Sequence, residues 1–385
     1  MTSIREAIAR MLSSPPPPAA GVYTAAAETQ EGRPYRLHLR LEEDGNGILI
    51  LDAATVLHLN PTAAEYAYHF LLGHNPEETA ADITRRYRIS RQQALADYAR
   101  FQERIHTLLE TPDLAPDLYL ETAGEETFTA LSAPLRLDCA LTYRLPEGVP
   151  AEYAPQRRVE RELSTAEWEA ILDKAWKVGI PHAVFTGGEP TLREDLPALI
   201  ARAEANGQVT GLCSLGLRLG ETAYRRTLLE TGLDHLLFLL RPNDPASWEA
   251  LEAILPEDLF TTVHLTLTPE NAPQAESHLR RLAELGANAL SLSAADPALY
   301  PALAPLQDLS ADLGLELKWG LPVPYGEANP VALEESAAGE PRPPSCACLY
   351  LEPDGDALPV QGLNRVLGNF LRDDWEAIWQ RAAAR

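Results

Sequence analysis

Cysteine is scarce in this sequence. The 385 residues include only four, Cys139, Cys213, Cys346 and Cys348, which are too few and too unevenly spaced for a disulfide framework in a chain of this length. This scarcity excludes the small disulfide-stabilised class of secreted proteins. A reducing compartment suits the chain better, and we expect it in the cytoplasm.

Positive charge is also in short supply. Asp and Glu number 56 against 32 Lys and Arg, which gives a formal net charge of −24. Such a surface repels nucleic-acid phosphates and anionic lipids, whereas a basic peptide or protein would be attracted. No apolar run approaches the roughly 18 residues that span a bilayer, and "MTSIREAIARML" is not a signal-peptide core. We expect neither nucleic acid nor a membrane as a partner.

The N-terminal third is organised as an arm followed by a small domain. Residues 1–33 contain a short helical pattern and "SSPPPPAAG", which we interpret as a helix and a stiff linker because proline cannot continue a helix. Residues 34–112 begin with short alternating runs and continue with three helical segments, for which Asn60 and Ser90 are predicted N-caps. This order predicts a winged-helix-like α+β domain, and acidic residues 113–130 then form a linker.

Residues 131–335 alternate regularly between strand and helix patterns. Ser164 and Glu167 form a predicted capping box at the first helix. Such alternation predicts an α/β fold with a parallel sheet, either a full or partial barrel or an open doubly wound sheet. The expected strands are 135–141, 183–186, 210–215, 235–240, 261–267, 289–293 and 315–319.

The stretch "FTGGEPTLREDLPALIARAEANG" at 185–207 is the most informative in the chain. With "LTYR" ending the first strand and "ELSTAEWEAIL" opening the first helix, it resembles the radical S-adenosylmethionine (SAM) superfamily. The resemblance covers residues 131–330 and implies a partial (β/α)6 TIM-like barrel. It also implies that SAM is contacted through the Gly-Gly-Glu-Pro motif, here Gly187, Gly188, Glu189 and Pro190.

Both flanks extend the resemblance. Residues 34–112 look like the peptide chaperone of pyrroloquinoline quinone biosynthesis, a recognition domain for leader peptides of ribosomally made, modified natural products. Residues 336–385, with "CACLYLEPDGDALPV", look like a degenerate SPASM/twitch tail. By this resemblance a leader peptide would add to the strand at 55–59 and pack on the helix at 92–105. The candidate contacts are Val56, Leu59, Tyr98, Phe101 and Ile105, of which Phe101 and Ile105 are equally suited to the core.

The residues expected to hold the family's [4Fe–4S] cluster are missing. The resemblance places three cysteine ligands at Leu145, Val149 and Glu152, and none of these is a thiol. Cys139 and Cys213 lie inside expected strands and suit small buried apolar positions. From these residues we expect no cluster, no catalytic residue of the family type and, at most, weak residual SAM binding.

Other family positions differ as well. "FLLRPNDP" carries Leu239 and Arg241 where relatives have polar residues, and "SLG" at 214–216 lacks an asparagine. In the tail, only Cys346 and Cys348 remain as weak metal candidates, because two thiols need further ligands to complete a site. The strand histidines His182, His235 and His264 show no metal spacing, so we interpret them as structural.

Two functions remain open at this point. The first is a catalytically degenerate scaffold or chaperone that binds a precursor peptide and presents it to an active modifying enzyme. The alternative is an enzyme that kept the barrel and uses SAM or another small ligand without a cluster. Its acid–base candidates at the barrel mouth are Glu147, Glu152, Glu189 and Asp244. We favour the scaffold, and therefore lean against an enzyme.

Overall fold

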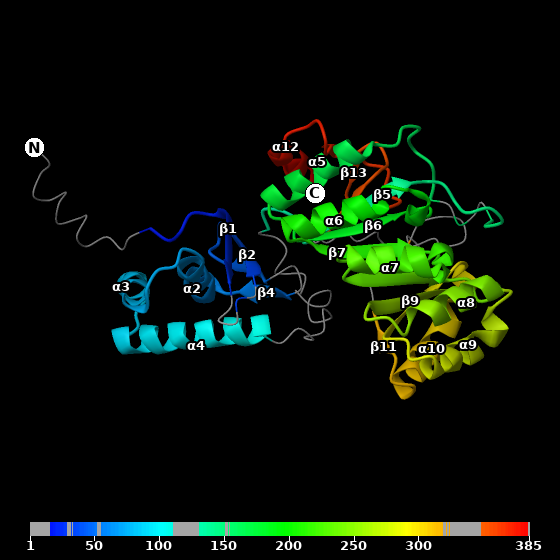
Figure 1. Cartoon of the computed structure of the whole chain (residues 1–385), viewed down its shortest axis with the longest axis horizontal. Coiled ribbons are helices and arrows are strands. Elements are labelled where there is room, and N and C mark those ends of the chain that lie inside the picture. Colours follow the sequence, from blue (N-terminus) through cyan, green and yellow to red (C-terminus); the bar gives the residue numbers. More distant parts are fainter. Residues whose placement is uncertain are drawn as a thin grey trace, which may run out of the picture. The chain divides into compact units, whose positions relative to one another are not determined.

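The structure is a computed structural model. It describes residues 16–28, 32, 34–51, 55–110, 131–150, 153, 155–318, 321, 323 and 348–383. The chain divides into two compact units, residues 1–122 with 130–132 and residues 123–129 with 133–385 (Figure 1). Each unit is described by itself below.

The first unit contains a four-stranded antiparallel sheet in the order β1-β2-β3-β4 and three described helices. Asn60 caps α2 by accepting from the Ala63 amide at 3.0 Å, and Ser90 does the same for Gln93 at 3.1 Å, as the sequence predicts. The elements are β1 (Gly21–Glu28), β2 (Pro34–Leu41), β3 (Gly47–Leu51), β4 (Thr55–Leu59), α2 (Pro61–Leu71), α3 (Pro76–Arg86) and α4 (Arg91–Glu110).

Strand β1 differs from expectation, because its residues were assigned to a linker. It pairs with β2 along its whole length, from Gly21 opposite Leu41 to Glu28 opposite Pro34. Its sequence, "GVYTAAAE", contains three alanines and so has little intrinsic strand propensity. Tyr23 and Ala25 pack against the hydrophobic cluster of the sheet, and this tertiary contact outweighs the weak local preference.

The second unit is built on a ten-stranded sheet in the order β11-β10-β9-β8-β7-β6-β5-β12-β13-β14. Strands β5 to β10 are parallel and follow one another in chain order, each with a helix after it. This gives six β/α units in an open, partial barrel and confirms the predicted fold class. The elements are β5 (Arg136–Thr142), α5 (Thr165–Lys177), β6 (His182–Gly187), α6 (Leu196–Asn206), β7 (Val209–Ser214), α7 (Thr222–Glu230), β8 (His235–Leu240), α8 (Pro245–Ile254), β9 (Phe260–Leu267), α9 (Ala275–Glu284), β10 (Ala289–Ala294), α10 (Tyr300–Asp312) and β11 (Glu316–Leu317).

The C-terminal tail completes the sheet at the β5 edge. Strand β12 (Cys348–Leu351) runs parallel to β5, with Cys348 opposite Arg136 and Leu351 opposite Cys139. Strands β13 (Asp356–Leu358) and β14 (Gly368–Asn369) follow antiparallel, and helix α12 (Trp375–Ala383) ends the described chain. Lys174 of α5 fastens this tail by donating to the Phe370 carbonyl at 2.8 Å.

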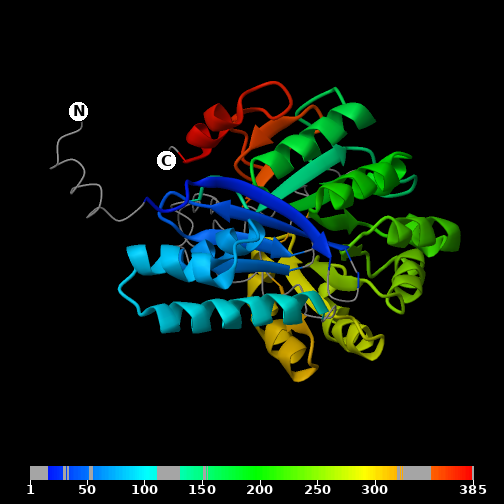
Figure 2. The same ribbon diagram turned by 60° about the vertical axis from the view of Figure 1, so that its left-hand side comes forward.

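The two faces of the large sheet differ in polarity. One face carries residues such as Leu137 and Phe185, which form the main hydrophobic core with helix residues such as Ile171 and Leu199. These helices lie along one side of the strands (Figure 2). Because side chains alternate along a strand, the opposite face carries the intervening, often polar residues, including His264.

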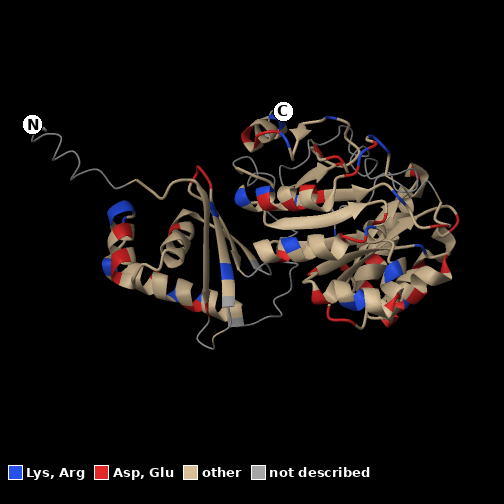
Figure 3. Cartoon of the chain, turned by 45° about the horizontal axis from the view of Figure 1, so that its top comes forward, with Lys and Arg blue, Asp and Glu red and all other residues tan. Residues whose placement is uncertain are grey.

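Charged residues are unevenly distributed between the strands and the rest of the chain. Figure 3 shows the acidic and basic residues mainly on the helices and loops, while most strand residues are uncharged. In the part of the chain that the structure describes, we find no helix with the length and apolar character of a membrane span.

Candidate functional site

The Gly-Gly pair lies where β6 passes very close to the end of β5. Gly187 has φ +124°, and a Cβ there would lie 2.3 Å from the Thr142 carbonyl oxygen. A Cβ on Gly188 would lie 2.3 Å from the Arg144 carbonyl oxygen. The Gly188 amide donates to the Thr142 carbonyl at 2.7 Å. Both positions therefore require glycine for the contact between two strand ends, independently of any ligand.

Glu189 lies at the centre of a buried hydrogen-bond network. Its side chain is 1% exposed. Oε1 accepts from the Thr191 amide and hydroxyl at 3.0 and 2.6 Å and from Ser214 Oγ at 2.8 Å, and Oε2 accepts from the Leu215 amide at 2.8 Å. Burial raises the pKa of Glu189, against the lowering effect of these bonds. The carboxylate thus joins the ends of β6 and β7 and orders the mouth of the barrel.

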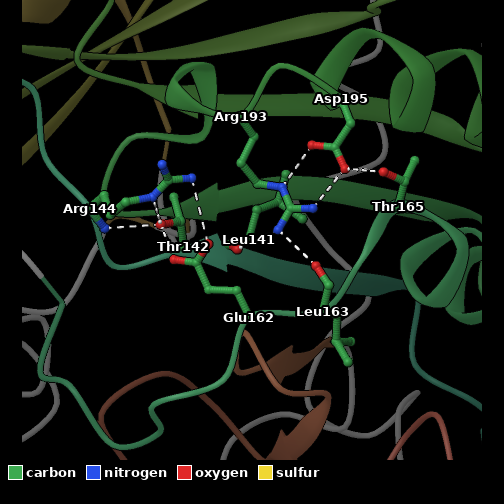
Figure 4. Close-up of polar contacts among 8 residues, drawn as sticks. All are labelled: Leu141, Thr142, Arg144, Glu162, Leu163, Thr165, Arg193 and Asp195. Carbon is green, nitrogen blue, oxygen red and sulfur yellow. Dashed lines mark hydrogen bonds and ion pairs between the residues drawn. The ribbon is translucent and has the colours of Figure 1, made fainter.

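The end of β5, where the resemblance begins its cluster loop, is tied down by arginines (Figure 4). Arg193 is 8% exposed, donates to the Leu163 carbonyl at 3.0 Å and pairs with Asp195 at 2.7 Å. Arg144 donates through its backbone amide and Nε to Thr142 Oγ1, both at 3.1 Å. Sequence reasoning missed this network, because single arginines in "LTYR" and "TLRED" give no pairing signal.

A cleft opens at the carboxyl ends of β6 to β9. It encloses about 510 Å³ of space, including its open mouth. His264 makes a hydrogen bond through Nδ1 to Ser291 and through Nε2 to Ser293, both at 3.0 Å. Arg241 pairs with Asp244, and its buried Nε has no partner within the described residues. The lining residues are Tyr153, Gly188, Leu215, Leu239, Leu240, Arg241, Pro242, His264, Thr266, Asn271 and Val323.

The expected cluster positions offer little to a metal. Leu145 and Val149 are half-buried aliphatic residues, and Glu152 lies outside the described residues. Cys139 and Cys213 are fully buried in β5 and β7, and burial raises the pKa of both thiols. The described residues therefore do not fit a [4Fe–4S] cluster.

The remaining polar candidates do not converge. Glu147 is exposed on a turn, whereas Asp244 accepts from the Ala246 amide at 3.0 Å as the N-cap of α8. His182 and His235 contact each other through their Nε2 atoms at 2.6 Å. Burial and Arg136 keep the pKa of His235 at about 4, so this ring stays neutral at ordinary pH. Cys348 begins β12, and Cys346 lies outside the described residues.

The peptide-contact candidates divide between core and surface. Tyr98 and Ile105 are each 1% exposed, and Tyr98 stacks on Tyr66 with ring centroids 5.7 Å apart. In the free chain both are therefore buried core residues, and their contact with a peptide stays a prediction. Phe101 and Leu59 are half-buried members of one hydrophobic cluster.

Val56 lies on the other face of β4, and its contact with a peptide stays a prediction. Leu57 and Leu59 pack against the cluster under the helices, whereas Val56 does not belong to it. Because strand side chains alternate, Val56 points to the opposite face of the sheet. On the α4 side of β4, the neighbour of Leu59 is therefore Leu57 rather than Val56.

Comparisons with known proteins agree with this fold. The barrel-bearing chain superposes on the crystal structure of Streptococcus suis SuiB bound to S-adenosylmethionine with a TM-score of 0.61, over 89% of this chain and 86% of SuiB, at 16% identity. The crystal structure of SuiB bound to precursor peptide SuiA superposes with a TM-score of 0.56, over 93% of this chain and 88% of SuiB, at 14% identity. At these identities the likeness shows the fold alone.

Sequence relationships are closer over part of the chain. It is 37% identical over 125 residues to the PqqA peptide cyclase of Granulibacter bethesdensis, covering 32% of this chain and 33% of that one. Over this part the chain is therefore similar to PqqA peptide cyclases. It is 31% identical over 180 residues to the PqqA peptide cyclase of Streptomyces rochei, and this match covers 43% of this chain and 49% of that one. The chain thus matches less than half the length of each of these two relatives. A comparison with protein-family models gave no match.

This relationship corrects our expectation about cofactors. From the missing cysteines we expected none, but the PqqA peptide cyclase relatives and the SuiB structure bound to S-adenosylmethionine contradict this expectation. The expectation that the protein has no cofactor is therefore wrong. The polar side chains that the cleft offers to a ligand are Arg241 and His264.

Proposed function

We propose that this chain binds a precursor peptide along the open edge of β4 and presents it during the modification of a ribosomally made peptide. The observation that carries the proposal is the position of β4 at the end of its sheet, where β3 is its only neighbour among the strands of the described residues. Such an edge exposes backbone donors and acceptors to an added strand.

The side chains beside this edge suit an apolar peptide residue. Leu57, Leu59 and Phe101 are half-buried on the margin of the cluster, so an added strand would cover apolar surface that is now partly exposed to water. SuiB, which shares the fold, was crystallised with its precursor peptide SuiA. This supports a peptide as the ligand class.

We assign presentation rather than radical chemistry to the chain because of Leu145 and Val149. An aliphatic side chain has no atom that can bind iron, and in the family the cluster ligands come from these positions. The chain would then work beside an active modifying enzyme that acts on the same peptide.

Backbone pairing at β4 can be tested with two neighbouring prolines. Along an edge strand, one of two consecutive residues directs its N–H to the neighbouring strand and the other directs it outward. Of Val56→Pro and Leu57→Pro, one should therefore abolish peptide binding while the sheet stays folded, and Leu59→Ala should only weaken binding. Calorimetry of the full chain with short peptides encoded by neighbouring genes measures this.

Circular dichroism and thermal unfolding of each variant serve as the control for folding. Full affinity in both folded proline variants would reject main-chain pairing. No binding by the intact chain to any of these peptides at high micromolar concentration would reject the proposed function.

A second candidate function is favoured by the cleft. The barrel could act as an enzyme on SAM or a similar small ligand, with Arg241 and His264 as its polar side chains. When bound, SAM would supply an electrophilic methyl group at its sulfonium. Arg241, through its unpartnered Nε, would then orient the ligand, and the leucines of the cleft would exclude water.

SAM binding should be measurable in this cleft. Leu239→Trp fills the space next to Val323, so we expect it to lower SAM affinity by at least about tenfold, a loss of roughly 1.4 kcal/mol. Leu363→Trp changes a residue that is 41% exposed and does not line the cleft, so it should leave affinity unchanged. Calorimetry in which wild type and Leu239→Trp bind SAM equally would place SAM elsewhere.

A further inference from the structure

A second, smaller pocket lies between the segment after β5 and the C-terminal tail. It encloses about 210 Å³ including its mouth, and it shares no lining residue with the cleft. Arg158 and Gln156 contribute from the first segment, and Glu352, Gln361 and Asn364 from the tail. Neither the proposed peptide site nor the cleft uses these residues.

The pocket contains a buried carboxylate whose two oxygens are both engaged. Glu352 is 2% exposed. Its Oε1 accepts from Arg158 Nη1 at 3.3 Å, and its Oε2 accepts from the Tyr143 hydroxyl. The Arg158 backbone amide donates to the same hydroxyl at 3.4 Å. Glu352 is therefore not available to a ligand cation; it positions the guanidinium of Arg158.

Arg158 retains donors that face the pocket. Its side chain is 20% exposed. Among the described residues it makes contacts only through Nη1 and the backbone amide, which leaves Nε and Nη2 without a protein acceptor there. A guanidinium held in one orientation by a buried carboxylate is suited to a planar acceptor, because its N–H groups form a rigid fork.

The rest of the pocket is lined by carboxamides. Gln361 donates to the Tyr350 hydroxyl at 3.5 Å, while Gln156 and Asn364 are exposed at the mouth. Two apolar side chains, Leu363 and Val366, follow in the same loop and are 41% and 46% exposed. The loop that carries Gln361 and Asn364 therefore also presents apolar surface to solvent.

We propose that this pocket binds a carboxylate, either an acidic side chain of a peptide or a free small carboxylic acid. The ligand's two oxygens would accept from the free donors of Arg158 and from the carboxamides. The formal charge of −24 repels anions in general, so binding here depends on these local donors. The peptide source, unlike the site itself, rests on the proposed function.

Ligand-observed NMR with the full chain tests the site directly. The probe is N-acetylglutamate N-methylamide, and its neutral counterpart is N-acetylglutamine N-methylamide. We expect the acid to bind at least about tenfold more tightly than the amide, because only the acid forms charge-assisted bonds to Arg158. Arg158→Gln should remove this preference.

Arg157→Gln is the matched control. Arg157 is adjacent, 60% exposed and paired with Glu160 at 2.5 Å, and it does not line the pocket. Equal binding of acid and amide, or equal losses in Arg157→Gln and Arg158→Gln, would overturn the proposal. Loss of the preference in Arg158→Gln alone, with unchanged thermal unfolding, would support it.

A second binding experiment, with a peptide as the ligand, distinguishes an acidic peptide side chain from a free small carboxylic acid. The affinity of a short peptide encoded by a neighbouring gene is compared with that of the same peptide in which each Asp and Glu is changed to Asn and Gln. Both peptides are measured on wild type and on Arg158→Gln. A difference that Arg158→Gln removes supports the peptide source. If the free acid binds but the peptide shows no such difference, the peptide source is overturned and a small acid is the occupant. Failure of the proposed function itself would instead appear in the β4 variants.

Discussion

Glu189→Ala should lower the free energy of unfolding of the barrel by about 3–5 kcal/mol, because it leaves buried donors without an acceptor. The carboxylate accepts from two amides and two hydroxyls contributed by Thr191, Ser214 and Leu215. The hydroxyls can turn to other acceptors, whereas the Leu215 and Thr191 amides cannot. Denaturant unfolding followed by circular dichroism measures the change.

Glu189→Gln removes the negative charge but keeps the shape of the side chain, so it separates the two contributions to stability. The amide group keeps one acceptor oxygen but opposes a second donor, so we expect a loss of about 1–3 kcal/mol. Burial raises the pKa of Glu189 above its unfolded value, so the wild-type contribution is largest below that unfolded pKa and declines as pH rises through the folded pKa. The difference between wild type and Glu189→Gln should therefore be larger in mildly acidic buffer than in mildly alkaline buffer. A variant as stable as wild type in both buffers would contradict the structural role.

Gly188→Ala is expected to be comparably damaging, by about 3 kcal/mol or more, through steric overlap alone. Its Cβ would lie 2.3 Å from the Arg144 carbonyl oxygen and 2.8 Å from two further backbone atoms of Tyr143. This overlap can be relieved only if the ends of β5 and β6 move apart. That movement breaks the 2.8 Å hydrogen bond from the Glu189 amide to the Arg144 carbonyl. Thermal unfolding and soluble yield report the effect.

Gly286→Ala provides the comparison. Gly286 has φ +78°, but nothing lies within 4 Å of the Cβ position, so only backbone strain of about 1 kcal/mol is expected. If Gly188→Ala costs no more than Gly286→Ala, the close approach of the two strand ends is not a constraint on the fold.

The barrel could be predicted closely from sequence because its signals are local. The expected strand at 235–240 coincides with β8, and the other expected strands of the barrel overlap β5 to β11. The predicted capping box of Ser164 and Glu167 is present, with the Ser164 amide donating to Glu167 at 2.9 Å. Period-two runs and helix caps act within a few residues, so no long-range information is needed.

The site was harder to predict because its contacts join distant residues. The contact between Tyr143 and Glu352 crosses 209 positions, and nothing near either residue indicates the other. The face of Val56 could not be read from the sequence, because "TVLHL" has apolar residues on both faces of the strand, Val56 on one and Leu57 and Leu59 on the other. Such a strand does not reveal which face meets the helices. Strand β1 was missed because its alanines give no strand signal.

The pairing of β12 with β5 has a consequence for the order of folding. During synthesis, β5 emerges early, but the strand that covers its outer edge follows roughly 200 residues later. Until then the nascent barrel exposes an unpaired edge, which other unfinished chains can join. Strands that leave the ribosome late thus close the first part of the barrel. Chains truncated before β12 should be the form of this protein most prone to aggregate, even though they contain all six β/α units.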